Sequence, residues 1–239
     1  MQRTTLVMAA SGAGLVLAPW TLAGTVNARF AGGGVTVNTS AEAPGGQPDD
    51  DVNSTNATDV LIDADGVSTS GLVSSAGSFS GAIEDVTPES PFDGPFTQLS
   101  FLADLTLSQP EPGGTAFAGV NTSQFNDPAP ILLELDEAAR FSFSLDAFGD
   151  FDEEDFEFDF RPIGDTGAGF DGDVLLPGTY EIEFRLSLFL NENELQKSAG
   201  FEFLLLLDSD VEPIIPLPGP AGLALLGVGA VALRRRRSA

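Results

Sequence analysis

The chain has 239 residues, a formal net charge of −26, and neither cysteine nor histidine. This composition excludes disulfide bonds, zinc sites of the His/Cys type and Ser-His-Asp catalysis. Nucleic-acid binding needs basic side chains opposite phosphates, so the chain predicts no nucleic-acid partner.

Without histidine, general acid–base catalysis near neutral pH has few candidates. Only a pair of carboxylates, as in glycoside hydrolysis, remains available for catalysis. A single tyrosine (Tyr180) and a single tryptophan (Trp20) leave almost no aromatic platform for stacking on sugar rings. We therefore expect a protein that is not an enzyme and needs no cofactor.

Residues 1–28 have the layout of a secretory signal peptide. Arg3 gives a weakly positive start, and a mostly apolar run rich in small residues follows it. Small residues stand at the positions that a signal peptidase requires before a cut after Ala23 and before a cut after Ala28. The sequence predicts export and leaves the choice between these cuts open. An uncleaved anchor helix is the alternative.

Residues 29–75 are rich in glycine, serine, threonine and aspartate and poor in large apolar side chains. Short strands are expected at residues 35–37 and 60–62, where valine, leucine and isoleucine gather. The stretch between them, residues 41–56, contains Pro-Gly-Gly and Asp-Asp-Asp. This composition predicts a loop or a mobile arm.

Residues 76–210 change to a period of two, in which apolar and polar side chains alternate. Such alternation is typical of half-buried strands whose apolar stripes share one core. We therefore predict an all-β fold, an antiparallel β-sandwich of jelly-roll or Ig-like type. Leu102 interrupts one polar stripe and suggests a strand covered on both faces. The local helix former at residues 135–140 is too short to stand alone. The predicted strands are residues 79–86, 99–107, 131–135, 141–147, 156–160, 180–188 and 201–207.

Three acidic clusters are candidates for binding Ca²⁺, which prefers several oxygen ligands. In residues 63–66, an EF-hand alignment places Leu61 and Leu72 at the first and twelfth ligand positions, so that interpretation fails. Residues 150–155 and 165–173 flank the predicted strand 156–160. Either loop is a candidate calcium site, and the two could meet at one sheet edge if the topology allows. Solvated loop charge is the alternative.

Residues 211–239 have three parts in a fixed order. A proline-rich hinge (residues 215–220) precedes an apolar run (residues 221–233), and four arginines follow: Arg234, Arg235, Arg236 and Arg237. The 17 uncharged residues 217–233 would span about 25 Å as a helix, at the short end for a hydrocarbon core of about 30 Å. This pattern predicts a transmembrane helix, with the arginines in the cytoplasm and the rest of the chain outside.

The order of hinge, short apolar helix and arginine cluster resembles the PEP-CTERM sorting signal of exported bacterial proteins. The usual core of that signal is Pro-Glu-Pro, and here Pro216, Leu217 and Pro218 align with it, with Glu212 just upstream. The resemblance implies that an exosortase, a transpeptidase-like membrane enzyme, recognises and removes the tail. It also implies a bacterium that makes extracellular polysaccharide. A plain membrane anchor and a buried apolar helix are the alternatives.

These observations favour an exported structural or interaction protein of the cell envelope or extracellular matrix. It would be membrane-anchored before processing and would then lie at the cell surface or in the matrix. The expected partners are an exosortase-like enzyme, the bacterial membrane through residues 217–233, and extracellular polysaccharide. The alternative is a calcium- or carbohydrate-binding surface module held by a plain C-terminal membrane anchor. A carboxylate-pair hydrolase is a third, weaker reading.

Overall fold

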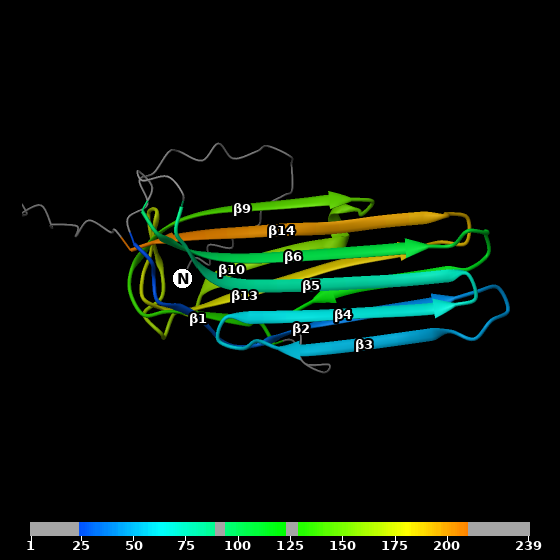
Figure 1. Cartoon of the computed structure of the whole chain (residues 1–239), viewed down its shortest axis with the longest axis horizontal. Coiled ribbons are helices and arrows are strands. Elements are labelled where there is room, and N and C mark those ends of the chain that lie inside the picture. The colour runs from blue at the N-terminus through cyan, green and yellow to red at the C-terminus, as the bar shows by residue number, and fades with distance from the viewer. Residues whose placement is uncertain (1–23, 89–93, 123–128, 210–239) are drawn as a thin grey trace, which may run out of the picture.

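A computed structural model describes residues 24–88, 94–122 and 129–209, which form two antiparallel β-sheets (Figure 1). Among these residues the only helical element is a short 3-10 turn, η1 (Glu153–Asp155). The predicted all-β, antiparallel fold is therefore confirmed. The predicted transmembrane helix lies outside the described residues, and of the predicted signal segment only residues 24–28 are described.

Sheet 1 has the strand order β1-β8-β13-β7-β2-β3, with β10 also paired to β13. Sheet 2 has the order β11-β12-β9-β14-β6-β5-β4. The strands of sheet 1 are β1 (Ala28–Gly32), β2 (Gly34–Glu42), β3 (Asp49–Asn56), β7 (Thr115–Asn121), β8 (Ile131–Leu135), β10 (Phe156–Pro162) and β13 (Gly178–Leu190). The strands of sheet 2 are β4 (Leu61–Ser70), β5 (Val73–Val86), β6 (Phe96–Ser108), β9 (Ala139–Gly149), β11 (Phe170–Asp171), β12 (Val174–Leu175) and β14 (Gln196–Asp208).

Sheet 1 contains seven strands but is only five strands wide, because two of its positions are each occupied by two short strands in succession. Tyr180 of β13 lies between β8 and β10, and Arg185 of the same strand lies between β7 and β10. Therefore β8 and β7 follow one another along the same edge of β13. The next position is occupied by β1 and β2 in the same way. Gly33 joins these two strands with a φ of 90°, and a Cβ there would overlap the backbone of Pro130, so the position requires glycine.

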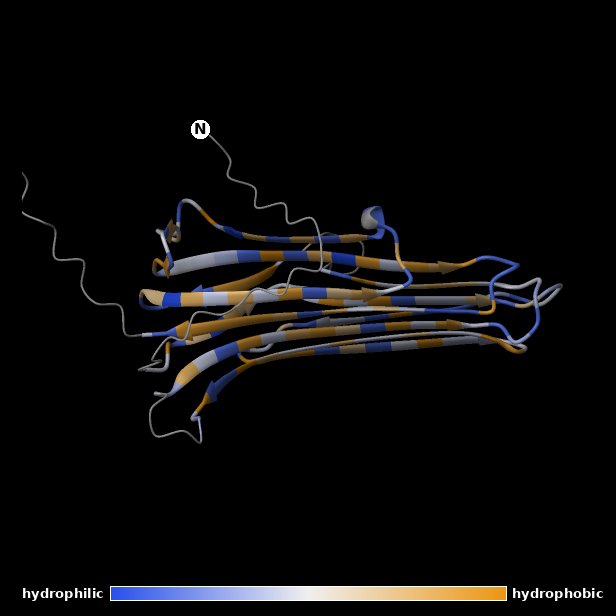
Figure 2. Cartoon of the chain, turned by 90° about the horizontal axis from the view of Figure 1, so that it is seen from above, coloured by the Kyte–Doolittle hydropathy of each residue, from blue (hydrophilic) through white to orange (hydrophobic). Residues whose placement is uncertain are grey.

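The two sheets face each other across one continuous hydrophobic core. Hydropathy alternates along the strands, which gives each sheet an apolar inner face (Figure 2). Phe79 of sheet 2 stacks on Phe184 of sheet 1, with ring centroids 4.9 Å apart, and Phe184 also contacts Phe201, at 5.2 Å. The predicted inward stripes of β6, β13 and β14 are confirmed: their members are Leu99, Phe101, Ala103, Leu105, Leu107, Tyr180, Ile182, Phe184, Leu186, Leu188, Phe201, Phe203, Leu205 and Leu207, all buried.

Two local predictions are wrong. Residues 41–56 are not a loop or arm throughout, because most of them belong to β2 and β3, which pair from Gly34 with Asn56 to Ala41 with Asp49. Leu102 is 43% exposed, so β6 is covered on one face only. Residues 135–140 form no helix, as the shortness of this stretch predicts: they are the end of β8, a bend and the start of β9.

The elongated body has two ends. The terminal end holds Gly24 and Ser209, whose backbones are joined by a hydrogen bond of 3.2 Å from the Ser209 nitrogen to the Gly24 oxygen. The distal end consists of the loops that follow β2, β4, β6, β9 and β13, at the right of Figure 1. The first and last described residues thus leave the body side by side.

Candidate functional site

The residues predicted to act in sorting lie outside the described part of the chain. These are Pro216, Leu217, Pro218, Arg234, Arg235, Arg236 and Arg237. Within residues 24–88, 94–122 and 129–209, no helix is both long and apolar enough to cross a bilayer. The described body does contain four polar arrangements that use its acidic side chains.

The two candidate calcium loops do not meet. Residues 150–155 precede β10 and residues 165–173 follow it, so the seven residues of β10 hold them about 20 Å apart. Their acids make structural contacts instead: Asp150 accepts from the Ser198 nitrogen at 3.2 Å, and Asp173 pairs with Arg140 at 3.5 Å. Among the described residues no group of three acidic side chains is placed to hold a metal ion.

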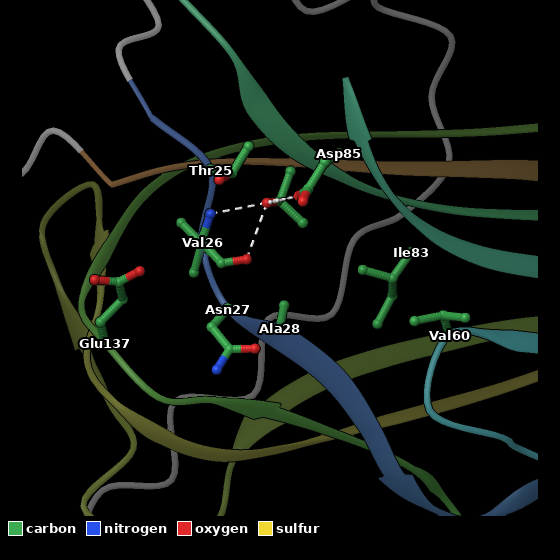
Figure 3. A pocket seen from close by; sticks show the side chains of 9 residues that line it. Thr25, Val26, Asn27, Ala28, Val60, Ile83, Asp85 and Glu137 are labelled. Carbon is green, nitrogen blue, oxygen red and sulfur yellow. Dashed lines mark hydrogen bonds between the residues drawn. The ribbon is translucent and has the colours of Figure 1, made fainter. Parts of the chain in front are cut away.

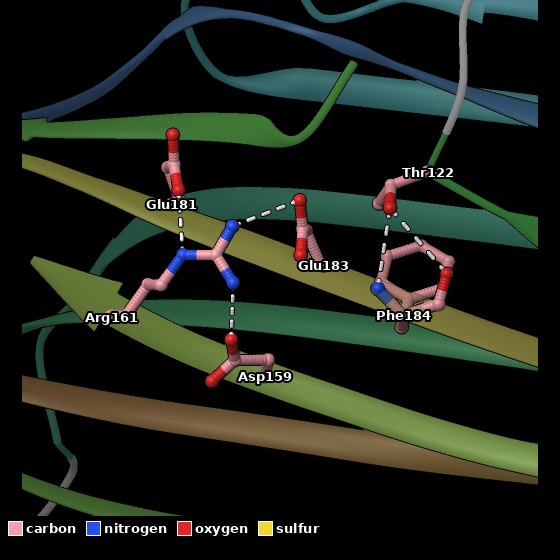
Figure 4. Close-up of polar contacts among 6 residues, drawn as sticks. All are labelled: Thr122, Asp159, Arg161, Glu181, Glu183 and Phe184. Carbon is pink, nitrogen blue, oxygen red and sulfur yellow. Dashed lines mark hydrogen bonds and ion pairs between the residues drawn. The ribbon is translucent and has the colours of Figure 1, made fainter. Parts of the chain in front are cut away.

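The strongest charge cluster lies on the outer face of sheet 1, where Arg161 of β10 contacts three carboxylates (Figure 4). Its guanidinium lies 2.5 Å from Asp159, 2.7 Å from Glu181 and 3.0 Å from Glu183. Partial burial acts to lower the pKa of Arg161, but the hydrogen bonds to the three carboxylates outweigh it and raise that pKa above its ordinary value. One permanent cation therefore holds three acids together across β10 and β13.

Side chains of β3, an edge strand of sheet 1, connect it to β4, an edge strand of sheet 2. Asp49 accepts from the Thr69 nitrogen at 2.7 Å, and Asp51 accepts from the Val67 nitrogen at 3.1 Å. Asn53 donates to the Asp65 carbonyl at 2.7 Å. Three alternate side chains of β3 thus bond to the backbone of β4, the edge strand of sheet 2. We call this arrangement the edge ladder.

A pocket of about 400 Å³ opens at the terminal end (Figure 3). Its lining combines backbone and side chains of the first described residues with Ile83, Asp85, Thr97 and Glu137. Thr97 is buried, and its hydroxyl lies 2.8 Å from both the Val26 nitrogen and Asp85 Oδ1. The polar atoms of Thr97, Val26 and Asp85 are thus bonded to one another within the pocket wall.

Among the described residues, the exposed aromatic side chains do not gather into a sugar platform. Tyr180 is fully buried, and its hydroxyl contacts the backbone oxygens of Gly169 at 2.8 Å and Leu176 at 2.7 Å. The exposed phenylalanines Phe148 and Phe189 come from different sheets. Phe170, which is also exposed, packs against Tyr180 with a centroid distance of 5.9 Å. Tyr180 and Phe170 thus connect the loop before β12 to β13.

Sequence reasoning missed the edge ladder, because Asp49-Asp50-Asp51 has the composition of a loop. The available signal was the alternation of Asp49, Asp51 and Asn53, which places three polar side chains on one face of a strand. Their partners are backbone groups of β4, which no sequence pattern identifies.

Comparisons with known proteins give no match: no family model, no curated protein and no solved structure matches the chain.

Proposed function

We propose that this protein is an exported structural or interaction protein of the cell envelope or extracellular matrix, sorted through its C-terminal segment. The observation that carries the proposal is the order of proline hinge, apolar run and arginine cluster in residues 215–237. An apolar run followed by a basic cluster is typical of a segment that stops in a membrane with its basic end in the cytoplasm.

The arrangement of the body is compatible with its attachment to a membrane through this segment. We take it as an antiparallel β-sandwich of jelly-roll or Ig-like type, with a signal helix within residues 1–28 and a transmembrane helix at residues 217–233. Both segments would leave the body from its terminal end, since Gly24 and Ser209 are neighbours there. The rest of the body would then be free of the membrane.

The charge distribution supports the same orientation. Arg3 and Arg234–Arg237 are five of the ten basic residues, so the part of the chain between them has five basic residues against 36 acidic ones. Such a body is repelled by anionic lipid and by nucleic acid, and it stays soluble. The proposed partners are an exosortase-like membrane enzyme, the bilayer around residues 217–233, and extracellular polysaccharide.

Mass spectrometry of the mature protein tests the proposal. The full chain is expressed in a bacterium that has an exosortase and in an otherwise identical strain without it. Sorting predicts a C-terminus near Pro216 and no arginine run in the first strain, and an intact Ala239 in the second. The Pro216→Ala/Pro218→Ala variant should remain unprocessed, whereas Pro112→Ala in the distal loop should be processed normally. An intact Ala239 in both strains would establish a plain anchor instead.

A further inference from the structure

The first described residues are fastened to the end of the last strand. The Gly24 nitrogen lies 3.1 Å from Asp208 Oδ1, and the Gly24 oxygen accepts from the Ser209 nitrogen at 3.2 Å. Val26 is 3% exposed, and its nitrogen and oxygen lie 2.8 Å and 3.0 Å from the Thr97 hydroxyl. The segment before β1 is therefore an integral part of the folded body.

This packing distinguishes the two cleavage positions that the sequence leaves open. A cut after Ala28 would remove Val26 from the core and take away the backbone groups that the buried Thr97 contacts. It would also remove Asn27, whose oxygen accepts from the Asp136 nitrogen at 3.2 Å. A cut after Ala23 removes none of these contacts.

A cut after Ala23 would place the new terminal amino group beside a carboxylate. Asp208 is only 1% exposed, and its carboxylate already faces the Gly24 nitrogen. A Cβ at position 24 would overlap the Ser209 hydroxyl in its present rotamer, and glycine avoids this contact. A buried carboxylate is stabilised far more by an ammonium group than by an amide N–H, because charge-assisted hydrogen bonds are the stronger ones.

We propose that a signal peptidase cuts the export leader between Ala23 and Gly24, and that the resulting α-ammonium group of Gly24 forms an ion pair with Asp208. Water cleaves the peptide bond, the Ala23 carbonyl becomes a carboxylate on the released leader, and the Gly24 nitrogen becomes an ammonium group. The inference rests on the proposed export of the protein. It makes removal of the leader a step that completes the fold.

The first test is the N-terminus of the full-length chain expressed in a bacterium and recovered from its envelope. Intact mass and N-terminal sequencing should give Gly24-Thr25-Val26. A start at Arg29 would overturn the inference while leaving export intact, and a retained leader on a cytoplasmic protein would overturn export itself. The Ala23→Ser variant should also start at Gly24, whereas Ala23→Leu should keep its leader, because a large residue before the cut blocks the peptidase. A Gly24 start in Ala23→Leu would show that a signal peptidase does not make this cut.

The second test examines the ion pair in the processed protein through Asp208→Asn, which keeps a hydrogen-bond acceptor and removes the charge. We expect its midpoint of thermal unfolding at pH 7 to fall by roughly 3–8 °C. An α-ammonium group loses its proton above a pH of about 8. The stabilisation is therefore complete below that pH and is lost as the pH rises further, so the difference should shrink to less than about 2 °C at pH 10.

Charged groups near this site include the carboxylates of Asp85, Asp136, Glu137 and Asp173 and the guanidinium of Arg140, which lies opposite Asp208 on β9 and pairs with Asp173. The exposed Asp104→Asn variant is the control and should leave the midpoint unchanged at both pH values. An Asp208→Asn effect of equal size at pH 7 and pH 10 would overturn the ion pair, because it would show that Asp208 acts on an uncharged group.

Discussion

Gln109, directly after β6, connects two loops of the distal end. Its side chain is fully buried, and its Oε1 accepts from the Gly114 nitrogen at 2.9 Å. Its Nε2 donates to the Asn191 carbonyl at 2.7 Å and also to the Glu194 carbonyl. One amide thus satisfies backbone groups of the loop after β6 and of the loop before β14.

Replacing Gln109 with alanine should lower the free energy of unfolding by about 2–4 kcal/mol. The buried Gly114 N–H loses its acceptor, which costs roughly 1–3 kcal/mol, and the two carbonyls, which water reaches more easily, add about 1 kcal/mol. In a body of this size the midpoint of thermal unfolding should fall by roughly 5–12 °C. Circular dichroism at several heating rates measures this change.

Gln109→Glu separates hydrogen bonding from the loss of side-chain volume. Its carboxylate would keep the bond to Gly114 but would place negative charge beside two carbonyl oxygens. We expect it to be at least as destabilised as Gln109→Ala at neutral pH. It should recover as the pH falls toward about 4, where the carboxyl binds a proton and can donate again. Gln109→Ala should show no such recovery.

The matched control is Gln98→Ala on β6, a half-buried position whose change should stay within about 0.5 kcal/mol of the wild type. If Gln109→Ala loses less than about 1 kcal/mol, or if Gln109→Glu is as stable as the wild type at pH 7, then Gln109 does not hold the two loops together and the reasoning fails.

Three further predictions concern the charged and ionisable groups of the body. Burial raises the pKa of Tyr180, against the effect of its backbone hydrogen bonds. The protonated side chain therefore stabilises the fold fully below a pH of about 10, and this stabilisation is lost as the pH rises beyond that value. Tyrosinate absorbance measures the ionisation of Tyr180 directly, since the chain has no other tyrosine. An ionisation midpoint at or below a pH of about 10 would contradict the prediction. The double variant Asp49→Ala/Asp51→Ala removes two hydrogen bonds of the edge ladder, so it should lower the free energy of unfolding by about 1–2 kcal/mol and promote association through β4. Light scattering should find larger species for this variant than for the exposed control Asp50→Ala. If both variants are monomers of equal size, the prediction is refuted. Arg161→Met leaves three carboxylates side by side and should cost about 1–2 kcal/mol at low ionic strength, with most of that loss recovered in 1 M salt as repulsion is screened; a urea midpoint that does not respond to salt would exclude this explanation.

The inward stripes of the long strands were predictable because each strand needs only its own period of two. In β13 and β14 every second side chain is apolar, and these side chains are buried as expected. Prediction failed where a strand depends on its neighbours. The strand β7 (Thr115–Asn121) was missed because its core-facing residues Ala116 and Ala118 are small and give only a weak apolar stripe.

The suggestion that the two acidic loops meet at one sheet edge is not supported by the structure. The sequence shows that residues 150–155 and 165–173 are both acidic and both adjoin one strand. Their order along the chain places one before the strand and the other after it, so the seven residues of β10 separate them. The contacts of Gly24 with Asp208 were beyond reach, since they join residues separated by 184 positions.

Because both termini lie at one end of the body, the length of the body determines how far the protein would extend from its point of attachment. Its strand β14 has 13 residues, which at about 3.3 Å each make a shaft of roughly 40 Å between the tether and the distal loops. In the proposed arrangement, with the tail in the bilayer, the distal loops that follow β2, β4, β6 and β13 would lie farthest from the lipid headgroups (Figure 1). A partner approaching from outside would then meet these loops first, among them Pro-Glu-Pro-Gly-Gly and Asn-Glu-Asn-Glu.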